Sequence, residues 1–278
     1  MFFALIGPGT GPLGAAPRTP WITWIHWITW IHWIAWIHWI DCHPVSYNFR
    51  RGDLRLLKAK IPFAGSSVSG VLGVPARTSN GTGVLLAHGA GTDMREELLS
   101  AIHRGLAERG YLTLKFNFPY SEMGRKSPDA QPRLEECYRR AYSFFLDHPK
   151  YSPQRLFVGG KSMGGRIASH LVATGLPAAG LIFLGYPLHP AGKPEKLRTE
   201  HLRNIPRPML FLSGAKDRLC TIPLLKEALE RVPAPTRLHV LPDGDHSFHV
   251  PKAFGRSDEE IQEELTEVIT NWIEEQPR

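Results

Sequence analysis

A serine between glycines, Ser162 in Gly160-Lys-Ser-Met-Gly164, is a candidate nucleophile. The apolar residues 156–158 precede it and an amphipathic run over residues 167–172 follows, so we expect a strand-to-helix turn with the serine at its apex. At such a turn the pattern G-x-S-x-G is a nucleophile elbow, whose glycines let strand and helix approach closely. The helix would begin beside the serine, where the N–H of Met163 can bind an oxyanion.

Two other interpretations compete for this segment. A phosphate loop of the form G-x-x-x-x-G-K-S requires glycine at position 155, where the chain has Arg155, and is excluded. A chance G-x-S-x-G in a glycine-containing turn is the second, because the five-residue pattern alone is weak. Whether the pattern is a nucleophile elbow or a chance match therefore depends on whether the rest of the chain supplies a base and a carboxylate.

The groups that a serine nucleophile needs follow Ser162 in the sequence. A serine hydroxyl needs a base, and the base needs an orienting carboxylate. Asp217 follows a strand expected over residues 209–213, and His246 follows one expected over residues 237–241. Because all three residues then lie at the carboxyl ends of strands, we predict the triad Ser162, Asp217 and His246.

Neighbouring residues compete for two of these roles. Asp217 could instead cap the helix expected from residue 222, which would leave Asp243 or Asp245 as the acid. His249, three residues after His246, is the rival base. The placement of Asp217 on a strand-end loop favours it as the acid, and we expect His249 at the surface or in a supporting role.

The loop His88-Gly-Ala-Gly91 is expected to complete the oxyanion site. It follows a strand predicted over residues 83–87, a position that supplies the second N–H to an oxyanion. We predict the N–H groups of Ala90 and Met163 as donors, with Gly91 as the alternative. His88 precedes the serine in the chain, which argues against a role as the base.

Strand-end loops are also expected to form a substrate cleft. Only residues 186–208 separate two core strands, which is too few for a helical lid, so we predict an open, shallow site. A shallow cleft rewards only the first few carbons of an acyl chain, which favours short acyl groups. The predicted pocket residues are His88, Gly89, Phe118, Tyr120 and Tyr186.

Strands alternating with helices position these residues and predict an α/β fold with a doubly wound, mostly parallel sheet and no large lid domain. An antiparallel opening pair is expected over residues 54–60 and 67–75. Further strands are expected at residues 83–87, 112–116, 156–158, 180–185, 209–213 and 237–241. Residues 117–132 are expected as a loop. Helices are expected at residues 96–109, 134–146, 163–172, 222–231 and 259–272.

The composition excludes several classes of protein. The net charge is +7, from 33 Lys+Arg against 26 Asp+Glu, and no basic cluster is interleaved with aromatic residues, so no nucleic-acid partner is expected. Three cysteines, Cys42, Cys137 and Cys220, show neither a disulfide framework nor a metal-binding pattern. We therefore expect free thiols in the cytoplasm, with no metal or other cofactor.

Residues 21–40 repeat Trp-Ile-x and hold seven of the eight tryptophans. The segment is uncharged and about 20 residues long, the length of a membrane-spanning helix. However, a period of three spreads tryptophan and histidine around the whole circumference of a helix and leaves no lipid-facing side, so membrane insertion is not favoured. We interpret residues 1–44 as a low-complexity extension, which a mis-assigned start would explain, and residues 45–278 as the domain.

Several motifs together resemble the α/β-hydrolase superfamily over about residues 53–275. They are His88-Gly-Ala-Gly91, Phe116-Asn-Phe-Pro-Tyr120, Gly159-Gly-Lys-Ser-Met-Gly-Gly165, Ser213-Gly-Ala-Lys-Asp217 and Asp245-His246. The chain is most similar to the dienelactone-hydrolase-like branch, which includes bacterial hydrolases related to the third subunit of the NSL chromatin complex. The resemblance implies the α/β-hydrolase fold and a triad. Dienelactone hydrolases proper carry cysteine where this chain has Ser162.

These observations predict a serine hydrolase that cleaves a small ester or thioester through an acyl-enzyme intermediate. An alternative is an interaction module on the same fold without catalysis, which the resemblance to a chromatin-complex subunit allows. Because a non-catalytic relative is free to lose the serine or the histidine, the complete set of triad residues favours an enzyme. A membrane-anchored hydrolase is a third interpretation and depends wholly on the Trp-Ile repeat.

Overall fold

The computed structural model describes residues 54–76 and 80–277. The predicted extension over residues 1–44, its Trp-Ile repeat and the predicted domain boundary at residue 45 lie outside the described residues. In the described ranges, none of the helices has the length and apolar character needed to cross a membrane.

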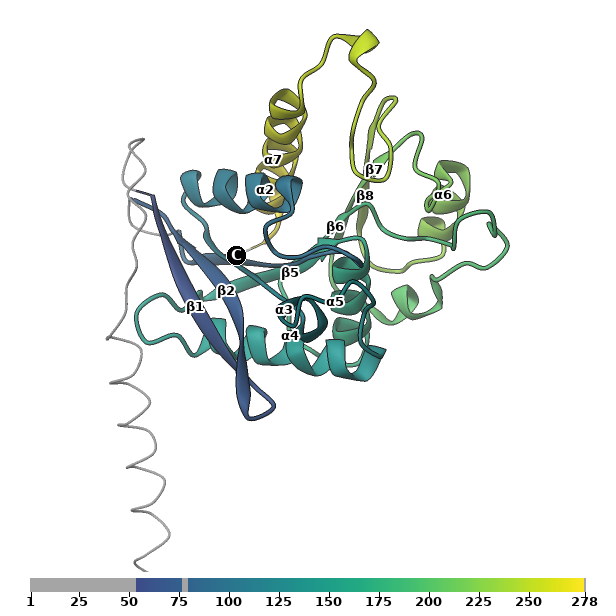
Figure 1. The fold of residues 1–278 in the computed structure, drawn as a ribbon. Helices are drawn as coiled ribbons and strands as arrows, with labels where there is room; N and C mark the ends of the chain where they lie inside the picture. Colours follow the sequence, from purple (N-terminus) through teal and green to yellow (C-terminus); the bar gives the residue numbers. More distant parts are fainter. Residues whose placement is uncertain (1–53, 77–79, 278) are drawn as a thin grey trace, which may run out of the picture. The chain divides into compact units, whose positions relative to one another are not determined.

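One eight-stranded sheet forms the centre of the described chain, in the order β1-β2-β4-β3-β5-β6-β7-β8 (Figure 1). Only the pairs β1–β2 and β2–β4 are antiparallel, which confirms the mostly parallel sheet. The strands are β1 Arg55–Phe63, β2 Ser66–Val74, β3 Thr82–Ala87, β4 Leu112–Phe116, β5 Arg155–Lys161, β6 Gly180–Leu184, β7 Met209–Gly214 and β8 Thr236–Leu241.

Helices cover both faces of the sheet, as the alternation of elements predicts. Figure 1 shows α2 and α7 on one face and α4 and α5 on the other. Side chains from α6 join the cluster that contains those of α4 and α5. The bounds are α2 Glu97–Glu108, α4 Gln131–Leu146, α5 Met163–Ala173, α6 Ile222–Glu230 and α7 Asp258–Glu275. The doubly wound fold class is therefore confirmed.

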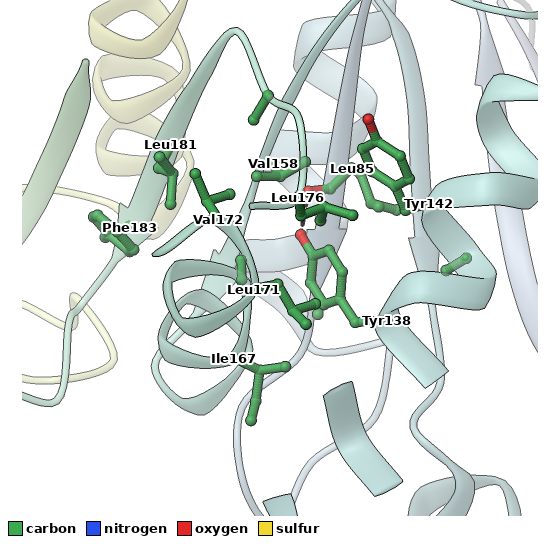
Figure 2. Packing of buried hydrophobic residues seen from close by; sticks show 14 of the residues in the cluster. Leu85, Tyr138, Tyr142, Val158, Ile167, Leu171, Val172, Leu176, Leu181 and Phe183 are labelled. Carbon is green, nitrogen blue, oxygen red and sulfur yellow. Dashed lines mark hydrogen bonds between the residues drawn. The ribbon is translucent and has the colours of Figure 1, made fainter. Parts of the chain in front are cut away.

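Alternate residues of each central strand enter opposite hydrophobic clusters, because successive side chains of a strand point to opposite faces. Leu85 of β3 and Val158 of β5 pack with Tyr138, Ile167 and Leu171 from α4 and α5 (Figure 2). Their neighbours along the strands join the other cluster, which includes residues of α2 and α7. Both faces of β3 and β5 are thus buried, which explains their continuous apolar runs.

Two helices differ from the sequence prediction. A turn of helix, α3 Pro119–Glu122, interrupts the predicted loop after β4. Helix α4 begins at residue 131 rather than 134, because Pro132 lies in its first turn, where a missing N–H breaks no helical hydrogen bond. Between β6 and β7 the chain forms one 3₁₀ helix, η1 Glu200–Asn204, and no lid domain.

Candidate active site

Ser162 lies at the junction of β5 and α5 with a positive φ, which is rare for a residue other than glycine: φ is 47° and ψ is −113°. Such a backbone costs on the order of 1–3 kcal/mol for a residue with a side chain and persists only when its surroundings enforce it. Here the Ser162 N–H donates to the carbonyl of Leu184 at 2.9 Å. A Cβ at Gly160 or at Gly164 would lie 2.2 or 2.3 Å from the carbonyl oxygen of Ala87, so this close approach requires both glycines.

His246 reaches Ser162 from the loop after β8. Its Nε2 lies 2.9 Å from Ser162 Oγ, and its side chain is 24% exposed. On the other side of the ring, Nδ1 lies 2.7 Å from Asp217 Oδ2. Because a carboxylate only accepts hydrogen bonds, Nδ1 carries the proton and Nε2 of the neutral ring is free to accept from the serine hydroxyl.

Asp217 is held in place by its own turn. Its Oδ1 accepts a hydrogen bond of 2.7 Å from the N–H of Leu219, and its side chain is fully buried. The turn follows β7, which pairs with β8 in parallel, so Asp217 and His246 come from neighbouring strand ends. The structure therefore brings the three predicted residues into one hydrogen-bonded line, although 84 positions separate Ser162 from His246 in sequence.

The rival residues have other partners. Asp243 pairs with Lys216 at 3.8 Å, and Asp245 accepts the N–H groups of Ser247 and His249 at 2.7 and 3.0 Å through one carboxylate oxygen. His249 Nδ1 lies 3.3 Å from Asp258 and its side chain is exposed. The structure thus places the rival carboxylates in the turn that carries His246 and directs the rival imidazole to α7.

The candidate oxyanion loop runs next to the serine. A Cβ on Gly89 would lie 3.6 Å from Ser162 Cβ, so the loop after β3 passes directly over the elbow. Ala90 is exposed, and Met163 is the first residue of α5. The free N–H groups of this helix end favour negative charge beside Ser162.

The four predicted pocket residues other than Gly89 have side chains that lie inside the protein rather than on an open wall. His88, Phe118 and Tyr120 have 0% exposure and Tyr186 has 1%. The His88 ring packs edge-on against Phe118 and Tyr120, with centroids 5.1 and 5.7 Å apart. Large aromatic rings gain more from burial than from lining a shallow surface, so the loops close over them. Gly89 is the predicted pocket residue that lies beside Ser162.

Lys161 is a residue of this site that the sequence interpretation did not identify. Its ammonium group donates a hydrogen bond of 2.7 Å to the backbone carbonyl of His246. The side chain is almost completely buried, and burial lowers the pKa of the amine. The sequence feature that could have identified it is a lysine at the end of an apolar strand, because a charge buried there needs a hydrogen-bonding partner.

Metal ligands do not cluster in the described part of the chain. Across residues 54–76 and 80–277, His, Cys, Asp and Glu side chains form no group of three or more that could hold an ion. Cys137 and Cys220 are buried free thiols, and Cys42 lies outside the described residues.

Known proteins share this architecture. The family model of the alpha/beta hydrolase domain matches residues 80–274, more than half of the chain. A dienelactone hydrolase from Anabaena variabilis is 20% identical, with a TM-score of 0.65 over 81% of this chain and 100% of that one. A serine hydrolase without a lid from Xanthomonas campestris is 17% identical, with a TM-score of 0.60 over 81% and 98%.

A cold-adapted esterase from an Arctic intertidal metagenomic library is 19% identical, with a TM-score of 0.61 over 85% of this chain and 99% of that one. At these identities the solved structures show a shared fold, and the family match extends through the segments that carry Ser162, Asp217 and His246. The chain belongs to the alpha/beta hydrolase domain family.

Proposed function

We propose that this protein is a serine hydrolase that cleaves small esters or thioesters through an acyl-enzyme intermediate. The observation that carries the proposal is the line of hydrogen bonds from Ser162 Oγ through the His246 ring to the buried Asp217 carboxylate. A hydroxyl bonded to an imidazole that is itself oriented by a carboxylate is the arrangement that activates serine for attack on a carbonyl.

In the first half of the reaction, Ser162 Oγ bonds to the substrate carbonyl carbon and passes its proton to His246 Nε2. The Asp217 carboxylate stabilises the imidazolium that forms, and the N–H groups of Ala90 and Met163 stabilise the oxyanion. Collapse of the tetrahedral intermediate breaks the bond to the alcohol or thiol, which takes the proton from His246. Water then attacks the acyl-enzyme by the same steps and releases the acid.

The similar solved structures support this choice of chemistry. Their names describe a serine hydrolase and an esterase, both on the fold that this chain adopts. The short connection between β6 and β7 supports a small acyl group, since only η1 lies between these strands. The buried thiols of Cys137 and Cys220 support a reducing, cytoplasmic location.

The second candidate is an interaction module without catalysis, related to the third subunit of the NSL chromatin complex. A fold alone permits either role. The strained backbone of Ser162 favours the hydrolase, because strain of this kind is maintained at functional sites and serves no purpose in a docking surface.

A fluorophosphonate probe tests the proposal directly. The wild type should be labelled, and Ser162→Ala should lose both the label and the hydrolysis of p-nitrophenyl acetate. Ser169→Ala is the matched control, since Ser169 Oγ also lies 2.7 Å from a histidine, His201, yet is completely buried. Equal labelling of wild type and Ser162→Ala would refute the proposed nucleophile.

A further inference from the structure

The carbonyl oxygen of Gly89 is held by three side chains. The Tyr120 hydroxyl donates to it at 3.0 Å and Thr92 Oγ1 at 3.1 Å, while His88 Nδ1 lies 2.8 Å away. A carbonyl oxygen has two lone pairs and commonly accepts one or two hydrogen bonds. Three donors on one oxygen fix the orientation of the Gly89–Ala90 peptide group more firmly than the turn alone would.

The protonation state of His88 agrees with a role as donor. Its Nε2 accepts the N–H of Phe118 at 3.0 Å, so the proton of the neutral ring resides on Nδ1 and points at the Gly89 carbonyl. Burial lowers the pKa of His88 to about 4, which keeps the ring neutral at pH 7. A charged ring would need to donate from Nε2 as well, and the Phe118 N–H already occupies that direction.

The peptide geometry transfers this constraint to the active site. In a trans peptide the C=O and N–H groups point in opposite directions. Because the Gly89 carbonyl points toward Tyr120, the N–H of Ala90 points to the opposite side of the loop. Gly89 itself backs onto Ser162, since a Cβ added to this glycine would lie 3.6 Å from Ser162 Cβ.

We propose that Tyr120, with Thr92 and His88, is a positioning residue that aims the Ala90 N–H at the oxyanion. The inference rests on the proposed function, since it assumes that Ser162 generates the oxyanion. Tyr120 has 0% exposure and its ring stacks on Phe118 at a centroid distance of 6.5 Å, so it acts through Gly89 and not by touching substrate.

A second contact joins the same two loops and supports a shared function. Asn117 Oδ1 accepts the N–H of Met94 at 2.9 Å, and Asn117 Nδ2 donates to Glu122 at 3.0 Å. The loop after β4 therefore holds the loop after β3 at both of its ends. Removal of the Tyr120 hydroxyl should loosen the orientation of one peptide group and leave the rest of this connection intact.

The test compares Tyr120→Phe with Tyr138→Phe. Tyr138 is an equally buried tyrosine whose hydroxyl bonds to backbone groups of Gly159 and Leu85 in the core. Outright loss of one oxyanion donor costs about 10²–10³-fold in kcat, so a donor that is only misaligned should cost roughly 10-fold. For Tyr120→Phe we expect this loss in kcat on p-nitrophenyl acetate, with KM changed by less than about twofold.

A boronic acid separates positioning from stability. Phenylboronic acid adds to the serine as a tetrahedral adduct with an oxygen at the oxyanion position, so its Ki should rise in Tyr120→Phe by the factor by which kcat falls. Tyr138→Phe should keep the wild-type kcat and Ki even where its melting temperature drops. Thr92→Val, which removes a second donor from Gly89, should shift kcat and Ki in the same direction.

Three outcomes would overturn the inference: wild-type kcat and Ki in Tyr120→Phe, a rise in KM alone, or an equal loss of kcat in Tyr138→Phe. If Tyr120→Phe fails to fold, Thr92→Val decides by the same measurements. Failure of the proposed function is distinct, because the wild type would then hydrolyse no ester, or Ser162→Ala would keep the activity of the wild type. If Ser162→Ala loses its activity while Tyr120→Phe keeps the kcat and Ki of the wild type, this inference alone is refuted.

Discussion

The Lys161 ammonium group donates a 2.7 Å hydrogen bond to the backbone carbonyl of His246. The residue that precedes the candidate nucleophile therefore holds the loop of the candidate base. The stem of Lys161 runs beside the oxyanion loop, since a Cβ on Gly89 would lie 3.7 Å from its Cγ, and its amine lies 5.9 Å from the centre of the Phe248 ring. One buried side chain thus lies against both the loop after β3 and the loop that carries His246.

Replacement of Lys161 by methionine should lower kcat by about 10-fold with little change in KM, because the loop of His246 loses its anchor while the apolar stem is retained. Steady-state kinetics on p-nitrophenyl acetate measures this. The control is Lys216→Met. This variant removes an exposed lysine that pairs with Asp243, which lies in the same loop as His246. Equal kcat in the two variants would show that the buried hydrogen bond does not position His246.

His246→Ala should lower kcat by roughly 10³-fold or more, because the serine loses its base. His249→Ala should stay within about tenfold, because the exposed His249 side chain contacts Asp258 and not Ser162. Both variants are compared by kcat on one ester. Equal losses would contradict the assignment of the base.

Activity should peak at short acyl groups, at about C2 to C6, in a series of p-nitrophenyl esters. A buried methylene contributes roughly 0.8 kcal/mol, so a long apolar channel would raise kcat/KM steadily with chain length. No lid lies between β6 and β7 to form the roof of such a channel. Values of kcat/KM that still rise at C12 in the absence of detergent would contradict this expectation.

Stability should fall in mild acid, because His103 is buried in the neutral form. Its Nε2 lies 3.0 Å from the Val71 carbonyl, and burial together with Lys115 lowers its pKa to about 3. The unfolded chain binds a proton near pH 6.5, and the folded chain binds it only near its own lower pKa. The contribution of neutral His103 to the free energy of unfolding is therefore fully present above about pH 6.5 and is lost as the pH falls toward 3.

Urea unfolding at pH 7, 6 and 5 measures the effect. Each pH unit within this window should remove about 1 kcal/mol of unfolding free energy through His103. In His103→Gln the dependence on pH should be shallower. Part of it should persist, because burial also lowers the pKa of His88, to about 4. Identical slopes for wild type and His103→Gln would exclude His103 as the source.

The local pattern of the sequence was sufficient for the strands and helices of the parallel sheet. The central strands β3, β6 and β7 are short, mostly apolar runs, because side chains buried on both faces leave little room for polar positions. The starts of helices were harder to predict near proline, because proline occurs both in loops and in the first turn of a helix. Pro119 and Pro132 were expected in a loop, yet each lies in the first turn of a helix, which needs no N–H from them.

For the candidate site, the sequence determined residue types and chain order: a serine between glycines, then an aspartate and a histidine after later strands. Only the tertiary structure decided which carboxylate bonds to the imidazole and which imidazole bonds to the serine. Asp243 and Asp245 are also carboxylates on a loop after a strand, and His249 lies three residues after His246. Distance between side chains from different strand ends depends on the path of each loop, which no local pattern encodes.

The tertiary structure also determined which side chains near the site are buried. The sequence placed Tyr120 and Tyr186 on loops at the sheet edge, where an open wall was expected, and the fold closes the loops over both rings. It also turns Lys161 inward to the carbonyl of His246. Aromatic rings and the stem of a lysine can lie on either side of a loop at equal local cost, so their direction is set by the neighbours they meet after the sheet has formed.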